Sequence, residues 1–152
     1  MVSWRYAPAD EAVRCRNKME VAVMTDLEKV KQYGWALEYV KNQTPEICMA
    51  AVKQNGYALE YVKKQTPEIC LEAVKENGFA LRYVKDQTEE ICLAAVKEDA
   101  WALEFVKNQT QEICMVAIGR EPRVIKYITN PTFLNTIRKQ YPELIARLYD
   151  RP

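Results

Sequence analysis

Histidine is absent from this chain of 152 residues, and the short motifs of common enzyme active sites are absent too. The sequence has no glycine-rich phosphate-binding loop and no signature of paired acids. Its five cysteines have no histidine that could act as their base. We therefore expect a protein that is not an enzyme, with no catalytic residues and no cofactor.

Long apolar runs are missing as well. No stretch of about 18 apolar residues occurs, and Asp10 and Glu11 lie where a signal peptide would need its apolar segment. The hydrophobic content of 49% and the charged content of 28% are ordinary for a soluble domain with one core. We expect a single cytoplasmic domain over residues 1–152 that makes no membrane contact.

Neither sign of charge dominates the chain, whose net charge is +1. The balance shifts along the sequence: residues 34–118 carry nine Lys and Arg against thirteen Asp and Glu, whereas residues 119–152 carry seven against three. The basic end is a weak signal for nucleic-acid binding, and it could equally meet an acidic surface of a protein. The basic residues considered for nucleic-acid contact are Arg120, Arg123, Lys126, Arg138 and Lys139.

A 22-residue unit is written four times without a gap: GWALEYVKNQTPEICMAAVKQN, GYALEYVKKQTPEICLEAVKEN, GFALRYVKDQTEEICLAAVKED and AWALEFVKNQTQEICMVAIGRE. A fixed period without insertions predicts units that all pack on their neighbours in the same way. We expect an all-α solenoid of stacked helix-turn-helix repeats at 34–121. An N-terminal cap at 1–33 and a degenerate fifth repeat with a C-terminal cap at 122–152 would close its ends.

Each unit contains two helical patterns, illustrated by residues 56–77. The segment YALEYVKKQ places Ala58, Leu59 and Val62 on one side of a helical wheel, which predicts a short first helix. Thr66 and Pro67 then suit the N-cap and first position of a second helix. Gly78 follows that helix, and we expect it to adopt the left-handed conformation that ends many helices. The apolar stripe of the second helix consists of Ile69, Cys70, Ala73 and Val74.

Four cysteines occupy the same position in successive units. Equivalent helices of neighbouring repeats lie roughly 8–10 Å apart, whereas a disulfide needs Cα atoms within about 4.4–6.8 Å. Four ligands spread over three repeat steps also cannot converge on one metal ion. We expect buried, reduced thiols without metal at Cys48, Cys70, Cys92 and Cys114.

The phrase AVKQNGYALEYV at 51–62, with AVKENGFALRYV at 73–84, resembles a family of short helical repeats known only as a domain of unknown function. That family occurs in bacteria, phages and giant viruses. The resemblance covers about residues 34–121. It implies an all-helical fold with no catalytic residues to transfer, and it names no ligand.

Aromatic residues recur at two positions of the unit, and both positions lie away from the centre of the apolar stripe. Such rings could be partner hot spots, stacking platforms for bases, or packing between repeats. The first aromatic position, where ring types interchange, is the one we expect to be exposed. The first position holds Trp35, Tyr57, Phe79 and Trp101, and the second holds Tyr39, Tyr61, Tyr83, Phe105 and Tyr127.

Several polar positions are identical in all four units. The threonines and glutamates fit helix capping, and we expect the glutamines to satisfy backbone groups at the turn between helices. The lysines are expected to be neutralised, as helix pairs, by Glu38, Glu60 and Glu104. The lysines are Lys41, Lys63, Lys85 and Lys107, and the glutamines are Gln43, Gln65, Gln87 and Gln109.

Together these features favour recognition of a macromolecule, chiefly a protein, through an elongated surface of the array. Because the similar family occurs in phages, one hypothesis is an inhibitor that occupies a host protein such as a defence nuclease. Nucleic-acid binding through the aromatic residues and the basic end is the alternative. The identity of the partner and the oligomeric state stay open. The expected protein-binding residues are Trp35, Tyr57, Phe79, Trp101, Glu38, Glu60, Arg82 and Glu104.

Overall fold

The computed structural model of the chain describes residues 24–143 and residue 146. Every regular element of this part is a helix, and α-helices alternate with 3₁₀ helices, labelled η. The elements are α2 (Asp26–Gln32), η2 (Gly34–Tyr39), α3 (Pro45–Gln54), η3 (Gly56–Tyr61), α4 (Pro67–Glu76), η4 (Gly78–Tyr83), α5 (Glu89–Glu98), η5 (Ala100–Phe105), α6 (Gln111–Arg120), η6 (Pro122–Tyr127) and α7 (Pro131–Gln140).

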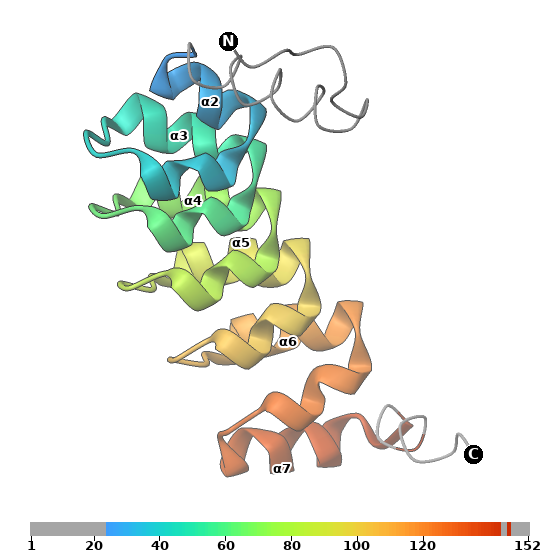
Figure 1. Ribbon diagram of the computed structural model, residues 1–152. Coiled ribbons are helices and arrows are strands. Elements are labelled where there is room, and N and C mark those ends of the chain that lie inside the picture. Colours follow the sequence, from blue (N-terminus) through green and yellow to red (C-terminus); the bar gives the residue numbers. More distant parts are fainter. Residues whose placement is uncertain (1–23, 144–145, 147–152) are drawn as a thin grey trace, which may run out of the picture.

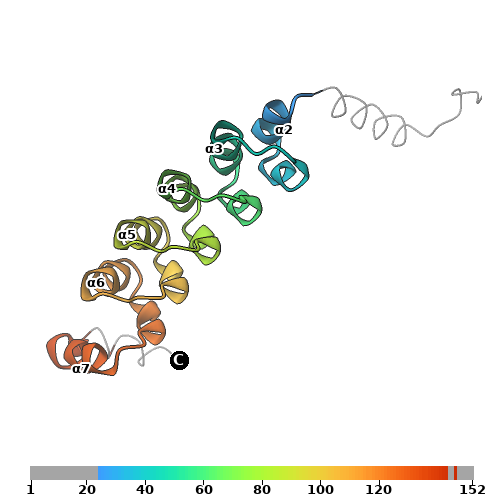
Figure 2. The ribbon, with the colours of Figure 1, turned by 90° about the vertical axis from the view of Figure 1, so that its left-hand side faces the viewer.

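The helices form a two-layered stack (Figure 1). The α-helices make one row and the 3₁₀ helices make a second row beside it, and the stack bends gently with the 3₁₀ row on its inner side (Figure 2). The expected all-α array of stacked repeats is confirmed. A fifth unit, η6 with α7, continues the stack. Most of the expected N-terminal cap lies outside the described residues, which include only α2 and its flanks.

The α-helices begin and bury their side chains as their sequences predict. Thr66 adopts an extended conformation and its side chain accepts a hydrogen bond from the backbone N–H of Ile69 at 3.4 Å, while Pro67 takes the first helical position. The other capping threonines, Thr44, Thr88 and Thr110, do the same. The expected stripe of α4 is confirmed, because its four residues are all buried.

The first helix of each unit is a 3₁₀ helix and is shorter than expected. In the second unit it ends at Tyr61, because Val62 is extended. Asn55 starts it, accepting a hydrogen bond on Oδ1 from the backbone N–H of Tyr57 at 3.0 Å. A six-residue segment between two extended residues suits the tight 3₁₀ geometry, which has three residues per turn. At this period Gly56, Leu59 and Val62 fall on one buried side.

The glycines that begin η2, η3 and η4 serve close packing between units. The expectation that Gly78 adopts a left-handed conformation is wrong, since no described residue has a positive φ. A Cβ atom on Gly56 would lie 2.5 Å from the carbonyl oxygen of Ala73, and Gly34 and Gly78 are equally confined. In the first three units glycine therefore lets the 3₁₀ helix touch the backbone of the next α-helix, whereas Ala100 takes the same position in the fourth unit.

A glutamine side chain links each of four 3₁₀ helices to the next. Gln87 Nε2 donates to the carbonyl oxygens of Leu81 at 3.3 Å and Phe105 at 2.9 Å, and its Oε1 accepts from the backbone N–H of Lys107 at 2.9 Å. The expected role of the glutamines in satisfying backbone groups is confirmed, and these bonds also join neighbouring units. Gln43, Gln65 and Gln109 make equivalent bonds.

The four repeated cysteines are buried and free, as expected. Each thiol lies between 3.7 and 3.9 Å from the Oε1 atom of the glutamine in its own unit. Burial raises the pKa of all four thiols, and it raises the pKa of Cys114 to about 11. The thiols are therefore protonated near neutral pH.

The repeated lysines are not neutralised as expected. Within the described part of the chain, no ion pair joins them to Glu38, Glu60 or Glu104. Lys63 Nζ instead donates to the carbonyl oxygen of Lys41 at 3.2 Å, and Lys107 Nζ donates to that of Lys85 at 3.1 Å. The reason is that the 3₁₀ helix ends two residues before the lysine, so the helical pairing geometry does not exist.

We predict that Gln87→Ala lowers the free energy of unfolding by about 1–3 kcal/mol, because backbone groups of two units lose a partner. Gln111→Ala is the matched control, since Gln111 is exposed on α6, and it should change stability by less than about 0.5 kcal/mol. Urea denaturation followed by circular dichroism measures both. Equal effects would contradict a linking role for Gln87.

Glycine replacement provides a second prediction. Gly56→Ala should destabilise the fold by about 1–3 kcal/mol, because its methyl group would clash with the carbonyl oxygen of Ala73. Gly119→Ala should instead stabilise by roughly 0.5–1 kcal/mol, because nothing lies within 4 Å of its Cβ position in helix α6. Thermal unfolding of the two variants should shift in opposite directions, and a shift in the same direction would refute the close-packing role.

Thiol reactivity should follow burial. In a Cys15→Ser variant, a thiol reagent at neutral pH should react slowly with the native protein and rapidly with all remaining cysteines in denaturant, because the native thiols are buried and have raised pKa values. The absorbance of the released chromophore measures both rates. Rapid native reaction, or fewer free thiols in denaturant than cysteines, would show this account to be wrong.

Candidate functional site

The 3₁₀ helices present a row of aromatic and charged side chains on the side of each helix that faces away from the core. At three residues per turn, the first aromatic position and the residue three places later lie on the same side of each helix. All the charged members are exposed. The structure thus brings the eight expected protein-binding residues onto one face. We call this surface the 3₁₀ ridge; its pairs are Trp35 and Glu38, Tyr57 and Glu60, Phe79 and Arg82, Trp101 and Glu104, and Arg123 and Lys126.

Exposed aromatic surface gathers at one end of the 3₁₀ ridge. Trp35 is 52% exposed and Tyr57 is 37% exposed, whereas Phe79 and Trp101 are half-buried. Tyr39, at the second aromatic position of η2, is 71% exposed. In the described residues, the large apolar side chains that are exposed are these three and Tyr33, all on or next to η2 and η3.

Further along the array, rings of neighbouring units pack on one another. The ring at the first position of one unit meets the ring at the second position of the next with tilted or edge-on geometry. The centroids of Phe79 and Phe105 are 5.8 Å apart, and those of Trp101 and Tyr127 are 6.0 Å apart. At η2, Trp35 instead meets Tyr39 of its own helix at 6.3 Å. Tyr57, although exposed, also meets Tyr83 of the next unit at 6.3 Å, so Trp35 is the first-position ring that meets no ring of the next unit in the described residues.

Cations of the chain itself cover the rings in the C-terminal half. The Arg82 guanidinium lies 5.3 Å from the ring centroid of Tyr83 and 5.5 Å from that of Phe105. Arg123 lies 5.5 Å and Lys126 5.1 Å from the ring of Trp101. These distances allow a cation–π attraction.

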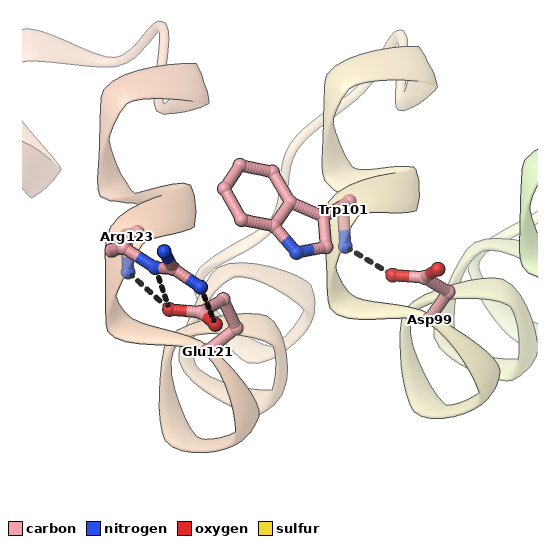
Figure 3. Close-up of polar contacts among 4 residues, drawn as sticks. All are labelled: Asp99, Trp101, Glu121 and Arg123. Carbon is pink, nitrogen blue, oxygen red and sulfur yellow. Dashed lines mark hydrogen bonds and ion pairs between the residues drawn. The ribbon is translucent and has the colours of Figure 1, made fainter.

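Two carboxylates fix this arrangement around Trp101 (Figure 3). Asp99 accepts a hydrogen bond from the backbone N–H of Trp101 at 2.9 Å. Glu121 accepts from the guanidinium of Arg123 through both of its oxygens at 2.9 Å, and this hydrogen bond and charge raise the pKa of Arg123. The indole of Trp101 reaches from η5 toward Arg123 on η6.

The residues considered for nucleic-acid contact lie on three elements. Only Arg123 and Lys126 belong to the 3₁₀ ridge, and Arg123 is paired with Glu121. Arg120 is the last residue of α6, and Arg138 and Lys139 lie in the last turn of α7. The ridge therefore gathers two of the five.

Acidic side chains flank the second-position rings in the N-terminal half. Burial raises the pKa of Tyr61, and the charges of Glu38 and Glu60 raise it further. Burial and then the hydrogen bond and charge of Glu60 raise the pKa of Tyr83. Tyr61 is therefore the ring whose pKa both carboxylates raise.

A groove of about 610 Å³ on the opposite face was not foreseen from the sequence. It lies between α4 and α5, with Leu71, Leu93 and Ala94 at its apolar base and charged residues such as Lys75 and Glu98 at its rim. Its sequence signal is the large apolar residue after each repeated cysteine, which is Met49, Leu71, Leu93 or Met115. All four of these side chains are half-buried and pack against the core.

The described residues contain neither a cluster of metal ligands nor a membrane-spanning helix. No group of three or more His, Cys, Asp or Glu side chains there is arranged to hold a metal ion. No described helix combines the length and the apolar character that crossing a membrane requires.

A family model described as Domain of unknown function (DUF4116) matches residues 27–66, 44–88 and 66–111. The second and third matches begin at Thr44 and Thr66, the N-caps of α3 and α4, and each covers two α-helices with the 3₁₀ helices that follow them. No curated protein and no solved structure gives a significant match. Because the matched residues extend over more than half of the sequence, the chain belongs to the family described as Domain of unknown function (DUF4116).

Proposed function

We propose that the chain is a non-enzymatic recognition module that binds a protein through the 3₁₀ ridge. The observation that carries the proposal is the gathering of Trp35, Tyr39 and Tyr57 as exposed aromatic surface beside charged residues. Aromatic anchors surrounded by polar groups are typical of the energetic centre of protein interfaces. A host protein occupied by the ridge, as in the inhibitor hypothesis, would be one instance of this function.

A nucleic acid fits the 3₁₀ ridge less well. Its exposed rings lie beside Glu38 and Glu60, and these carboxylates would repel phosphate groups. In the basic half, Arg123 is already paired with Glu121, and the ring of Trp101 is covered by Arg123 and Lys126. Base stacking on that ring would have to displace the chain's own cations.

The test is affinity capture with matched variants of the full chain. A partner bound by the wild type should be lost from a Trp35→Ala and Tyr57→Ala double variant, with a loss of more than about 1 kcal/mol in binding. Helical circular dichroism at room temperature should not change. A Lys75→Ala and Lys97→Ala variant alters two exposed residues of the α row and should retain the partner.

Two outcomes would contradict the proposal. Equal capture by both double variants would place the interface elsewhere, and unfolding of the ridge variant would assign its rings to packing. Titration with single- and double-stranded oligonucleotides across salt provides the second arm. Binding that weakens steeply with salt would support the nucleic-acid alternative instead.

A further inference from the structure

The repeated units show how a ring on the 3₁₀ ridge accommodates a cation. The third unit carries Arg82 at the charged position, and its guanidinium covers the second-position rings of its own and the next unit, Tyr83 and Phe105. The fifth unit carries Lys126 at the same position, 4.9 Å from the ring of Tyr127. In two of the five units, therefore, a cation of the chain itself lies over the second-position ring.

The first two units have carboxylates at the equivalent position. Glu38 and Glu60 are exposed, and in the described part of the chain neither takes part in an ion pair. Both lie close enough to Tyr61 to raise its pKa. No side-chain cation of the described residues lies over the rings of Trp35, Tyr39 or Tyr61. The rings of Trp35, Tyr39 and Tyr61 thus lie near carboxylates and carry no cation of the described residues, although Glu60 also hydrogen-bonds Tyr83, over whose ring Arg82 lies.

We infer that the partner of the 3₁₀ ridge is a protein with a basic segment, and that its arginine or lysine side chain binds between Glu38 and Glu60 against the rings of η2 and η3. This inference rests on the proposed function and names the chemistry of the partner. The bound cation would lie against second-position rings of the first two units, as the Arg82 guanidinium lies against those of the third and fourth units. Two carboxylates and exposed aromatic faces complement an apolar segment with positive charge.

The unit that carries Glu104 provides a natural comparison. Glu104 occupies the same charged position, but Lys126 and Arg123 already lie over the ring of Trp101 beside it. A second cation there would meet like charge. The inferred site therefore includes Glu38 and Glu60 and excludes Glu104, although all three are glutamates at one position of the repeat.

The experiment titrates the full chain with fluorescently labelled Gly-Ser peptides of equal length that carry several arginines, lysines or glutamates. Anisotropy at low salt should show binding of the arginine and lysine peptides and none of the glutamate peptide. Glu38→Gln with Glu60→Gln should weaken binding at least about fivefold, which corresponds to about 1 kcal/mol. Glu104→Gln should leave it within about twofold. All these variants keep side-chain size, and circular dichroism checks their fold.

Three results would overturn the inference. Equal losses for Glu104→Gln and for the Glu38 and Glu60 variant would show diffuse attraction by net charge. Binding of the glutamate peptide, or of no peptide, would show that the partner is not basic. The capture experiment above would still decide whether the ridge binds a protein. Self-association of the wild type that the Glu38 and Glu60 variant abolishes in sedimentation would make a second copy of this chain the occupant.

Discussion

The bridging glutamine is the interaction on which the array depends. The amide group of Gln87 bonds carbonyl oxygens of two successive 3₁₀ helices and the backbone N–H of Lys107, just after the second. Each unit thus supplies backbone partners that the next unit cannot provide for itself. A 3₁₀ helix of six residues is too short to persist alone. The fifth unit omits the glutamine, since Asn130 already caps α7 directly after Thr129.

Sequence reasoning succeeded where the cause lies within one unit. Thr66 and Pro67 start an α-helix through local hydrogen bonding and a fixed φ angle, and the buried stripe of α4 follows from its own periodicity. It failed where the cause lies in the neighbouring unit. Gly56 is fixed by the carbonyl oxygen of Ala73, and Lys63 by the carbonyl oxygen of Lys41. Neither contact can be read from the spacing of residues in a single copy.

The candidate site shows the same division. The ridge residues were identified from their repeated positions, because exchange among Trp, Tyr and Phe is typical of surfaces that need flat apolar area. Their unequal exposure was not foreseen, since it depends on the ring or cation that the next unit supplies. Trp101 is covered by Arg123 and Lys126. In the described residues Trp35 instead meets the rings of Tyr33 and Tyr39 and no cation. Identical positions in a repeat thus acquire different surroundings.

The threefold period of the 3₁₀ helices places buried residues and the proposed binding residues on different sides of the same short helix. Gly56, Leu59 and Val62 face the core, while Tyr57 and Glu60 face outward along the neighbouring line of the same helix. Substitution at the charged position would therefore change the charge of the proposed binding surface in one unit without touching the buried residues that hold the stack. Under the proposed function, relatives that differ only there would share a scaffold and bind different partners, with each of the five units contributing one charge along the same edge.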